Sequence, residues 1–105
     1  TDAAEQRFYQ ALEIDASIPE LYNNLGVVCW QKNDAAGALQ FLSKGLALDA
    51  RHPDLLLNTI QVLLTLQHLD EAEMLYKQYV EVNPLALEMR DLMEAARQAS
   101  TRAMP

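Results

Sequence analysis

The side chains best suited to chemistry in this sequence are one cysteine and two histidines. Cys29 falls on the apolar stripe of a predicted helix, so we interpret it as a core thiol. His52 and His68 lie near the two ends of another predicted helix, more than about 15 Å apart, and cannot share a metal ion. Asp70 and Glu71 are explained as helix N-terminal residues, which suit the helix dipole. We therefore predict no catalytic residue, no metal and no cofactor, and do not expect an enzyme.

The residues that recur along the chain indicate a repeat of 34 residues. Small, aliphatic and turn residues return at this interval in three successive segments. A fixed period of this length is typical of solenoids built from helical hairpins, which hold a partner on a curved face. The recurring sets are Ala4, Ala38 and Ala72; Leu12, Leu46 and Val80; Ile14, Leu48 and Val82; and Asp15, Asp49 and Asn83.

Length, composition and charge restrict the class of protein. Half of the 105 residues are hydrophobic and 3 are glycine, which favours one helical domain over disorder or turn-rich β structure. The net charge is −7 and Lys and Arg form no cluster, so nucleic acid and anionic membrane surfaces are not expected as partners. No apolar run approaches the ~20 residues that span a bilayer, so we expect no membrane insertion. Because the chain begins at Thr1, we expect an excised or processed piece, and the absence of a targeting signal does not settle the compartment, although the cytoplasm is favoured.

Turn signals divide the chain into six predicted helices. Pro19 and Pro53 each occupy a first helical turn, where a missing N–H costs nothing. Ser17 with Glu20 forms a capping-box pattern before the second helix. The third helix is expected to bury a stripe that ends at Leu48, and the fourth, almost wholly apolar, should lie at the centre of the domain. The predicted ranges are 2–16, 19–32, 35–49, 53–66, 69–81 and 85–100.

The segment from Leu21 to Pro53, LYNNLGVVCWQKNDAAGALQFLSKGLALDARHP, resembles a tetratricopeptide repeat (TPR). The residues that carry the resemblance are Tyr22, Leu25, Gly26, Ala38, Leu42, Gly45 and the pair Leu48 and Asp49. It implies an all-α, right-handed superhelix of antiparallel helix hairpins in a single domain over residues 1–105. Within this domain we predict an unpaired second helix over 1–18, full repeats over 19–52 and 53–86, and a capping helix with its tail over 87–105.

Small residues explain how hairpins of this kind pack. Gly26 and Ala38 let the two helices of the first hairpin approach closely, and Gly45 makes room for the next hairpin. In the second repeat Ile60 stands in place of Gly26, and Tyr79 stands in place of Gly45. We therefore expect a more open second hairpin and a disturbed contact with the helix that follows it.

In the TPR family the first helix of each hairpin lines the concave face, which implies where a peptide would bind here. Asn24 and Asn58 would form a two-rung ladder, because an amide both donates to and accepts from a peptide main chain. Trp30 would be an aromatic anchor. Each has a structural alternative: a hairpin role for the asparagines, and packing against the next hairpin for Trp30. The predicted peptide-binding residues are Asn23, Asn24, Val27, Trp30, Gln31, Leu57, Asn58, Gln61 and Leu64.

The charges of this face predict the class of partner. Family members that grip acidic C-terminal peptides use Lys and Arg as a carboxylate clamp, whereas the corresponding positions here hold Asn23, Asp54, Leu57 and Asn58. We therefore predict a protein or peptide partner that is neutral or basic rather than acidic. The predicted function is a protein–protein interaction scaffold that binds an extended peptide or a helix. The alternatives are the substrate-recognition arm of a larger enzyme, such as a glycosyltransferase, and a self-association module.

The first helix lacks the first half of its hairpin. Ala4, Phe8 and Leu12 would therefore lack part of their cover. Apolar surface of that kind is usually covered by another segment or another chain. We predict either that the chain comes from a longer protein, which supplies this cover, or that it self-associates through this stripe as a homo-oligomer.

Overall fold

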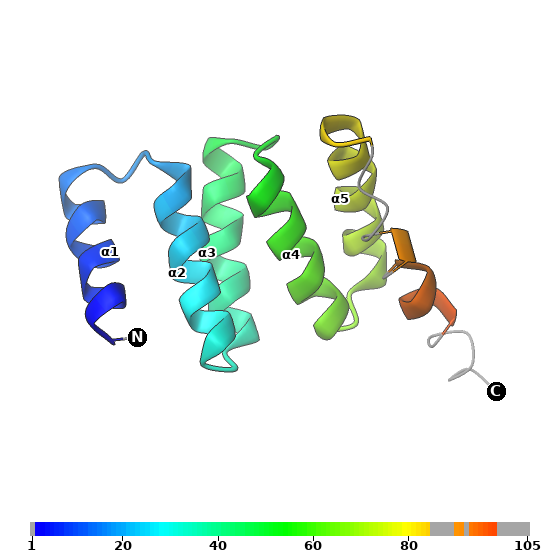
Figure 1. The fold of residues 1–105 in the computed structure, drawn as a ribbon, viewed down its shortest axis with the longest axis horizontal. Coiled ribbons are helices and arrows are strands. Elements are labelled where there is room, and N and C mark those ends of the chain that lie inside the picture. Colours follow the sequence, from blue (N-terminus) through cyan, green and yellow to red (C-terminus); the bar gives the residue numbers. More distant parts are fainter. Residues whose placement is uncertain (1, 85–89, 92, 99–105) are drawn as a thin grey trace.

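The computed structural model of the chain is a row of helices arranged as antiparallel hairpins (Figure 1). It describes residues 2–84, 90–91 and 93–98. The helices are α1 (Asp2–Ile14), α2 (Pro19–Gln31), α3 (Ala35–Leu48), α4 (Pro53–Thr65) and α5 (Leu69–Val82), and residues 90–91 and 93–98 are also helical. The predicted all-α solenoid of helical hairpins is confirmed. The expected start of the sixth helix lies outside the described residues.

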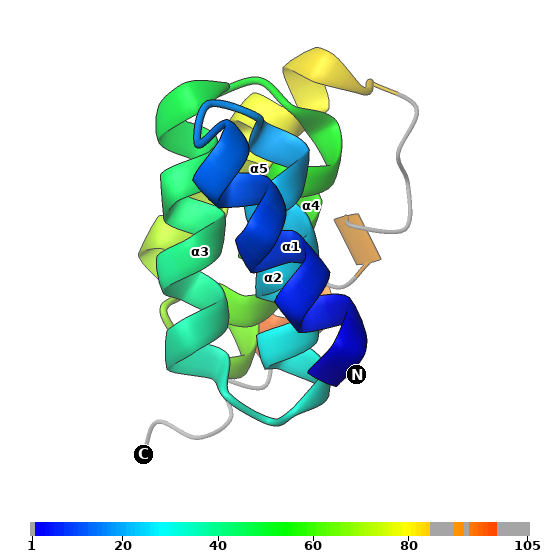
Figure 2. The same cartoon turned by 90° about the vertical axis from the view of Figure 1, so that its left-hand side faces the viewer.

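The helices form two layers, with α2 and α4 in one and α3 and α5 behind them (Figures 1 and 2). Seen from its end of the row, α1 leans across α2 (Figure 2). The molecule is elongated, with extents of 49 × 28 × 19 Å. One broad face is therefore formed by α2 and α4, the first helices of their hairpins, and the opposite face by α3 and α5, the second helices.

Among the described residues, no helix combines the length and apolar character needed to cross a membrane.

Two clusters of buried side chains form the core. One joins α4 and α5 to the last helical segment and contains Leu56, Ile60, Leu63, Ala72, Tyr79 and Met93. The other joins α3 to α4 and contains Ala38, Leu42, Leu55 and Val62. The predicted central position of α4 follows from this arrangement, because α4 contributes to both clusters.

The expected burial of Leu48 is wrong, because its side chain is 47% exposed. The buried stripe of α3 consists of Ala38, Leu42 and Gly45. At about 3.6 residues per turn that stripe continues to position 49, so Leu48 lies beside it at the last residue of the helix.

The predicted capping box at the start of α2 is also wrong. The N-cap residue is Ile18, which makes no side-chain capping hydrogen bond. Asp15 accounts for the difference, because its carboxylate accepts hydrogen bonds from both the backbone N–H, at 2.9 Å, and the hydroxyl of Ser17. The Ser17 side chain therefore faces back toward α1, and Glu20 is available for a contact with α4.

The two hairpins differ in closeness, as expected from Gly26 and Ile60. A Cβ on Gly26 would lie 2.7 Å from Cγ of Leu42, so α2 and α3 touch where glycine stands. The α4–α5 pair is in less extensive contact, although its helices have the same lengths of 13 and 14 residues. Tyr79 does not leave a gap after the second hairpin, since its ring is 6% exposed and packs in the same cluster as Met93.

Candidate functional site

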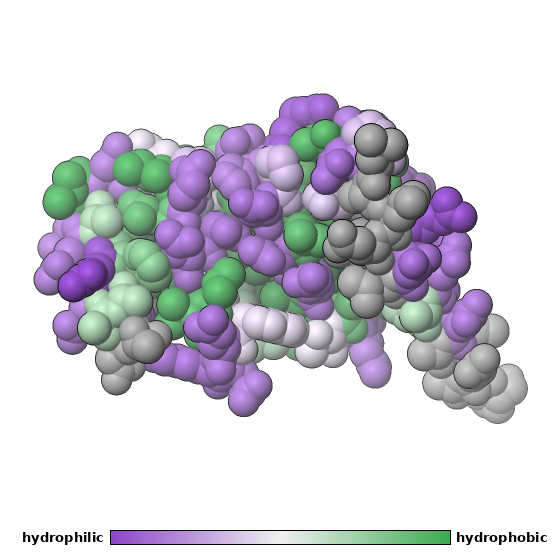
Figure 3. Space-filling view, in the orientation of Figure 1, coloured by the Kyte–Doolittle hydropathy of each residue, from purple (hydrophilic) through white to green (hydrophobic). Residues whose placement is uncertain are grey.

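The face formed by α2 and α4 contains the side chains best placed for recognition. Val27 and Trp30 lie on one stripe of α2, and Asn58 and Gln61 lie on one stripe of α4, because side chains three apart share a face of a helix. These four side chains line a small cleft of about 20 Å³ between the two helices. Gly26, Leu42 and Val62 also line it. Apolar and polar side chains intermix on this face (Figure 3).

Trp30 is a large apolar side chain at this cleft that remains exposed to solvent. Its exposed fraction is 38%, so packing against the next hairpin accounts for only part of its surface. Because the cleft holds about one water molecule, a ligand would cover Trp30 from outside rather than enter between the helices. Trp30 therefore lies at the surface of the face formed by α2 and α4.

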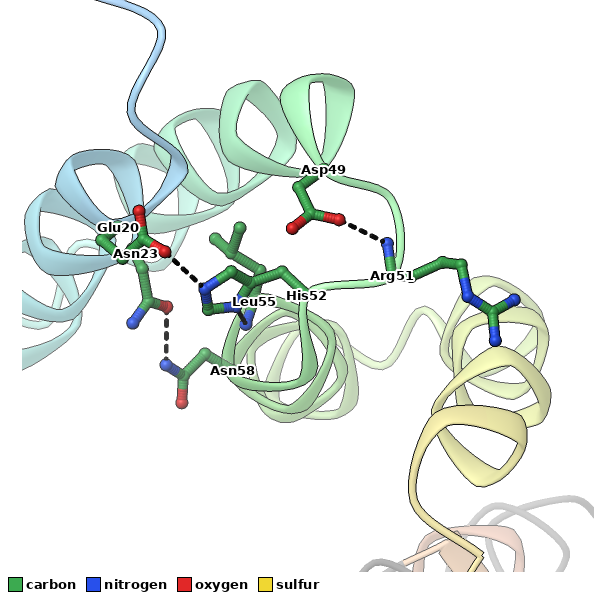
Figure 4. A network of polar contacts seen from close by, with 7 residues as sticks. All are labelled: Glu20, Asn23, Asp49, Arg51, His52, Leu55 and Asn58. Atoms are coloured by element: carbon green, nitrogen blue, oxygen red, sulfur yellow. Dashed lines mark hydrogen bonds and ion pairs between the residues drawn. The ribbon is translucent and has the colours of Figure 1, made fainter.

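A polar clasp ties α2 to α4 beside this cleft (Figure 4). Nδ2 of Asn58 donates to Oδ1 of Asn23 at 2.9 Å. Nearer the start of both helices, Nε2 of His52 lies 3.2 Å from Oε1 of Glu20. Nδ1 of His52 accepts from the backbone N–H of Leu55 at 3.4 Å, so a neutral ring carries its proton on Nε2 and donates it to Glu20. The clasp fixes the separation of the two helices that line the face.

This arrangement joins a different pair of asparagines from the pair singled out by the repeat. Asn58 pairs with Asn23, the neighbour of Asn24, and all three side chains are half-buried. The hydrogen bond leaves Oδ1 of Asn58 and Nδ2 of Asn23 as an outward acceptor and donor. Gln31 lies exposed at the last residue of α2.

Leu57 and Leu64 lie apart from the cleft at Trp30. Both are partly buried and pack against the core cluster that contains Ile60 and Met93. They therefore pack against that cluster and do not line the cleft at Trp30.

The stripe predicted for self-association packs partly within the chain. Ala4, Phe8 and Leu12 are each half-buried, and α1 contacts α2. An ion pair between Lys32 and Glu5 joins the C-terminal end of α2 to α1.

The residues considered for catalysis are separated. Cys29 is half-buried, and burial together with the nearby Asp34 carboxylate raises the pKa of its thiol. His52 and His68 are the N-cap residues of α4 and α5. Within the described residues, no three His, Cys, Asp or Glu side chains gather as a metal site.

Sequence reasoning missed the contact between Glu20 and His52. The signal was present, because Glu20 follows the proline that starts α2 and His52 precedes the proline that starts α4. In a row of hairpins these starts lie side by side. The sequence alone did not show that the two side chains point toward each other.

The fold and the face of first helices define a solenoid of helical hairpins. The sequence model of the family described as tetratricopeptide repeat matches residues 30–96, and the chain belongs to this family. A search of curated proteins found no matching relative.

Solved structures of the same fold support this assignment. One is the first TPR of Spaghetti (RPAP3) bound to the HSP90 peptide SRMEEVD, with a TM-score of 0.87, 21% identity, and coverage of 95% of this chain and 81% of that one. Another is the NMR structure of the first TPR domain of the human RPAP3 protein, with a TM-score of 0.87, 21% identity, and coverage of 96% and 80%. At this level of identity the likeness shows the fold.

Proposed function

We propose that this chain is a protein–protein interaction domain that binds an extended segment or a helix of a partner on the face formed by α2 and α4. The observation that carries the proposal is the convergence of Val27 and Trp30 with Asn58 and Gln61 around one cleft. An exposed tryptophan beside fixed amides has the composition of a binding hot spot, in which an aromatic anchor provides contact area and polar groups set the register.

The asparagine clasp would read the main chain of the bound segment. Asn58 Oδ1 accepts a peptide N–H, and Asn23 Nδ2 donates to a peptide C=O, while the bond between the two residues holds both amides in place. Asn24 lies beside this pair and would add a contact to the same segment. Recognition of this kind is independent of the partner's side chains, so selectivity would come from the residue that covers Trp30.

The charge of the face favours a neutral or basic partner. Glu20 and Asp54 lie at the start of α2 and α4, and the positions of a carboxylate clamp carry no basic residue. The related structure of Spaghetti holds the acidic peptide SRMEEVD. We propose that this chain binds a different class of peptide, because an acidic segment would meet carboxylates here without a compensating cation.

The test uses the fluorescence of Trp30, which is the only tryptophan of the chain. Peptides selected from a random phage library are titrated against the domain, alongside SRMEEVD. Trp30→Ala, followed with labelled peptide, should weaken binding of a selected peptide at least ~10-fold, as should Asn58→Ala. Leu48→Ala is the matched control, since Leu48 is 47% exposed at the last residue of α3 and lines neither cleft. The proposal would be refuted if SRMEEVD bound as tightly as the selected peptides, or if neither Trp30→Ala nor Asn58→Ala changed the affinity for a selected peptide.

Self-association is the second candidate, favoured by the exposure of α1. Tyr9 is 42% and Ile14 is 88% exposed, and α1 is held by less extensive contacts than the other consecutive helices. Sedimentation equilibrium of the wild type and of Phe8→Glu distinguishes the two candidates. A dimer lost in Phe8→Glu supports assembly through α1, and a monomer at all concentrations rules it out.

A further inference from the structure

The opposite face of the molecule carries a groove between α3 and α5, here called the α3–α5 seam. A cavity of about 340 Å³ opens there, which is within the range of ligand pockets. Leu39, Leu46, Leu63 and Leu75 line it with apolar surface. The cavity shares Leu39 and Ser43 with a wider hollow that is also lined by Lys44 and reaches His68 at the start of α5.

The repeat shows what is missing from this seam. Between α1 and α3, the ring of Tyr9 packs edge-on against Phe41 at a centroid distance of 6.2 Å. The ammonium of Lys44 lies 5.7 Å from the centre of the Phe41 ring. Two aromatic rings and one cation therefore meet at the α1–α3 seam, where Tyr9 stays 42% exposed.

The same three positions, 34 residues later, hold smaller or neutral side chains. Ser43 stands in place of Tyr9, Leu75 in place of Phe41, and Gln78 in place of Lys44. All three line the cavity of the α3–α5 seam. The α3–α5 seam therefore lacks, at these repeat positions, the ring and the cation found in its counterpart.

We infer that the α3–α5 seam is a second docking surface, which takes an aromatic side chain of a partner protein followed by a basic residue. The aromatic ring would occupy the place that Tyr9 fills in the α1–α3 seam, between Ser43 and Leu75. The basic preference comes from Glu71, the one charged side chain among the described residues that line the cavity. At the rim, Met74 is 65% exposed and offers an adaptable apolar contact.

The first experiment titrates the whole, ¹⁵N-labelled chain with N-acetyl amino-acid amides and follows the backbone amide signals in ¹H–¹⁵N correlation NMR spectra. N-acetyl-tyrosinamide should shift the amide signals of Ser43 and Leu75, and do so at lower concentration than N-acetyl-leucinamide. Ser43→Tyr, which restores the ring found at position 9, should abolish these shifts. Met74→Glu is a second variant on the exposed rim and should weaken them. Equal binding of both probes, shifts that persist in both variants, or shifts confined to Trp30 would overturn the inference.

The basic preference has its own test. The amide of N-acetyl-Tyr-Arg should bind several-fold tighter than the amide of N-acetyl-Tyr-Glu, and Glu71→Gln should remove the difference. No difference between the dipeptides in the wild type would refute the assigned charge.

A second copy of the chain is the competing occupant. Sedimentation equilibrium detects such a copy. A dimer that is present in the wild type and absent in Ser43→Tyr would show that the seam binds a second copy of the chain and not a partner protein. Because Trp30→Ala leaves the seam intact, its effect on peptide binding tests the α2–α4 face separately.

Discussion

Replacement of Gly26 by alanine tests how closely the first hairpin is packed. The added Cβ would lie 2.7 Å from Cγ and 2.8 Å from Cδ2 of Leu42, and 3.4 Å from the carbonyl oxygen of Ala38. Leu42 is 1% exposed and Ala38 is fully buried, and the cleft that Gly26 and Leu42 line measures only about 20 Å³, so Leu42 has little space to move into. Overpacking of this kind costs about 1–3 kcal/mol. Alanine in place of glycine inside a helix stabilises the helix by about 1 kcal/mol, which offsets part of this cost.

We therefore expect Gly26→Ala to lower the free energy of unfolding by about 1 kcal/mol, with a fall in Tm of roughly 4–8 °C for a domain of this size. The assay is urea unfolding followed by circular dichroism. The sharper measurement is a double-mutant cycle with Leu42→Ala, which by itself should cost about 2–5 kcal/mol. In that background the clash is removed, so Gly26→Ala should become stabilising by about 1 kcal/mol.

The reversal of sign separates a steric effect from a general one. If Gly26→Ala stabilises the wild type by the full helix-propensity gain, Leu42 moves aside freely and glycine is not required by packing. If the substitution destabilises both backgrounds equally, the cost does not come from Leu42. Either result would refute the interpretation of Gly26 as the contact point of α2 and α3.

Two further predictions follow from single residues. Gln67 ends the turn after α4 with a φ of 62°, so Gln67→Gly should raise the free energy of unfolding by about 0.5–1 kcal/mol in urea melts. Asn33 has a φ of 61°, and Asn33→Gly should raise the free energy of unfolding by less, because asparagine tolerates this conformation. A lower free energy of unfolding in Gln67→Gly would contradict the argument. Burial raises the pKa of Cys29 in the folded chain, so the unfolded thiol ionises first and stability falls as pH rises through its ordinary pKa of about 8.5. Between about pH 8 and 10 the wild type should therefore lose more stability than Cys29→Ser, and parallel curves would show that the thiol makes no contribution.

The sequence by itself determined where the helices lie and that they repeat. Proline at the start of α2 and of α4, and the 34-residue return of small residues, act through local backbone geometry and need no knowledge of distant neighbours. The contrast between Gly26 and Ile60 was also readable, because side-chain size at one position limits how closely two helices approach. Ser17 was misjudged because the carboxylates of Glu20 and Asp15 could both accept from its backbone N–H, and Asp15, which is nearer in the sequence, does so.

Only the tertiary structure decided which sides of each helix meet. Periodicity shows the stripe that is buried, but the partner of a side chain at the edge of that stripe depends on how neighbouring helices cross. For this reason Asn58 bonds to Asn23 rather than lining up with Asn24, and Leu57 packs against the core cluster instead of lining the cleft at Trp30. The open α3–α5 seam follows the same rule: Ser43 is an ordinary helix residue in the sequence and becomes a gap only beside α5.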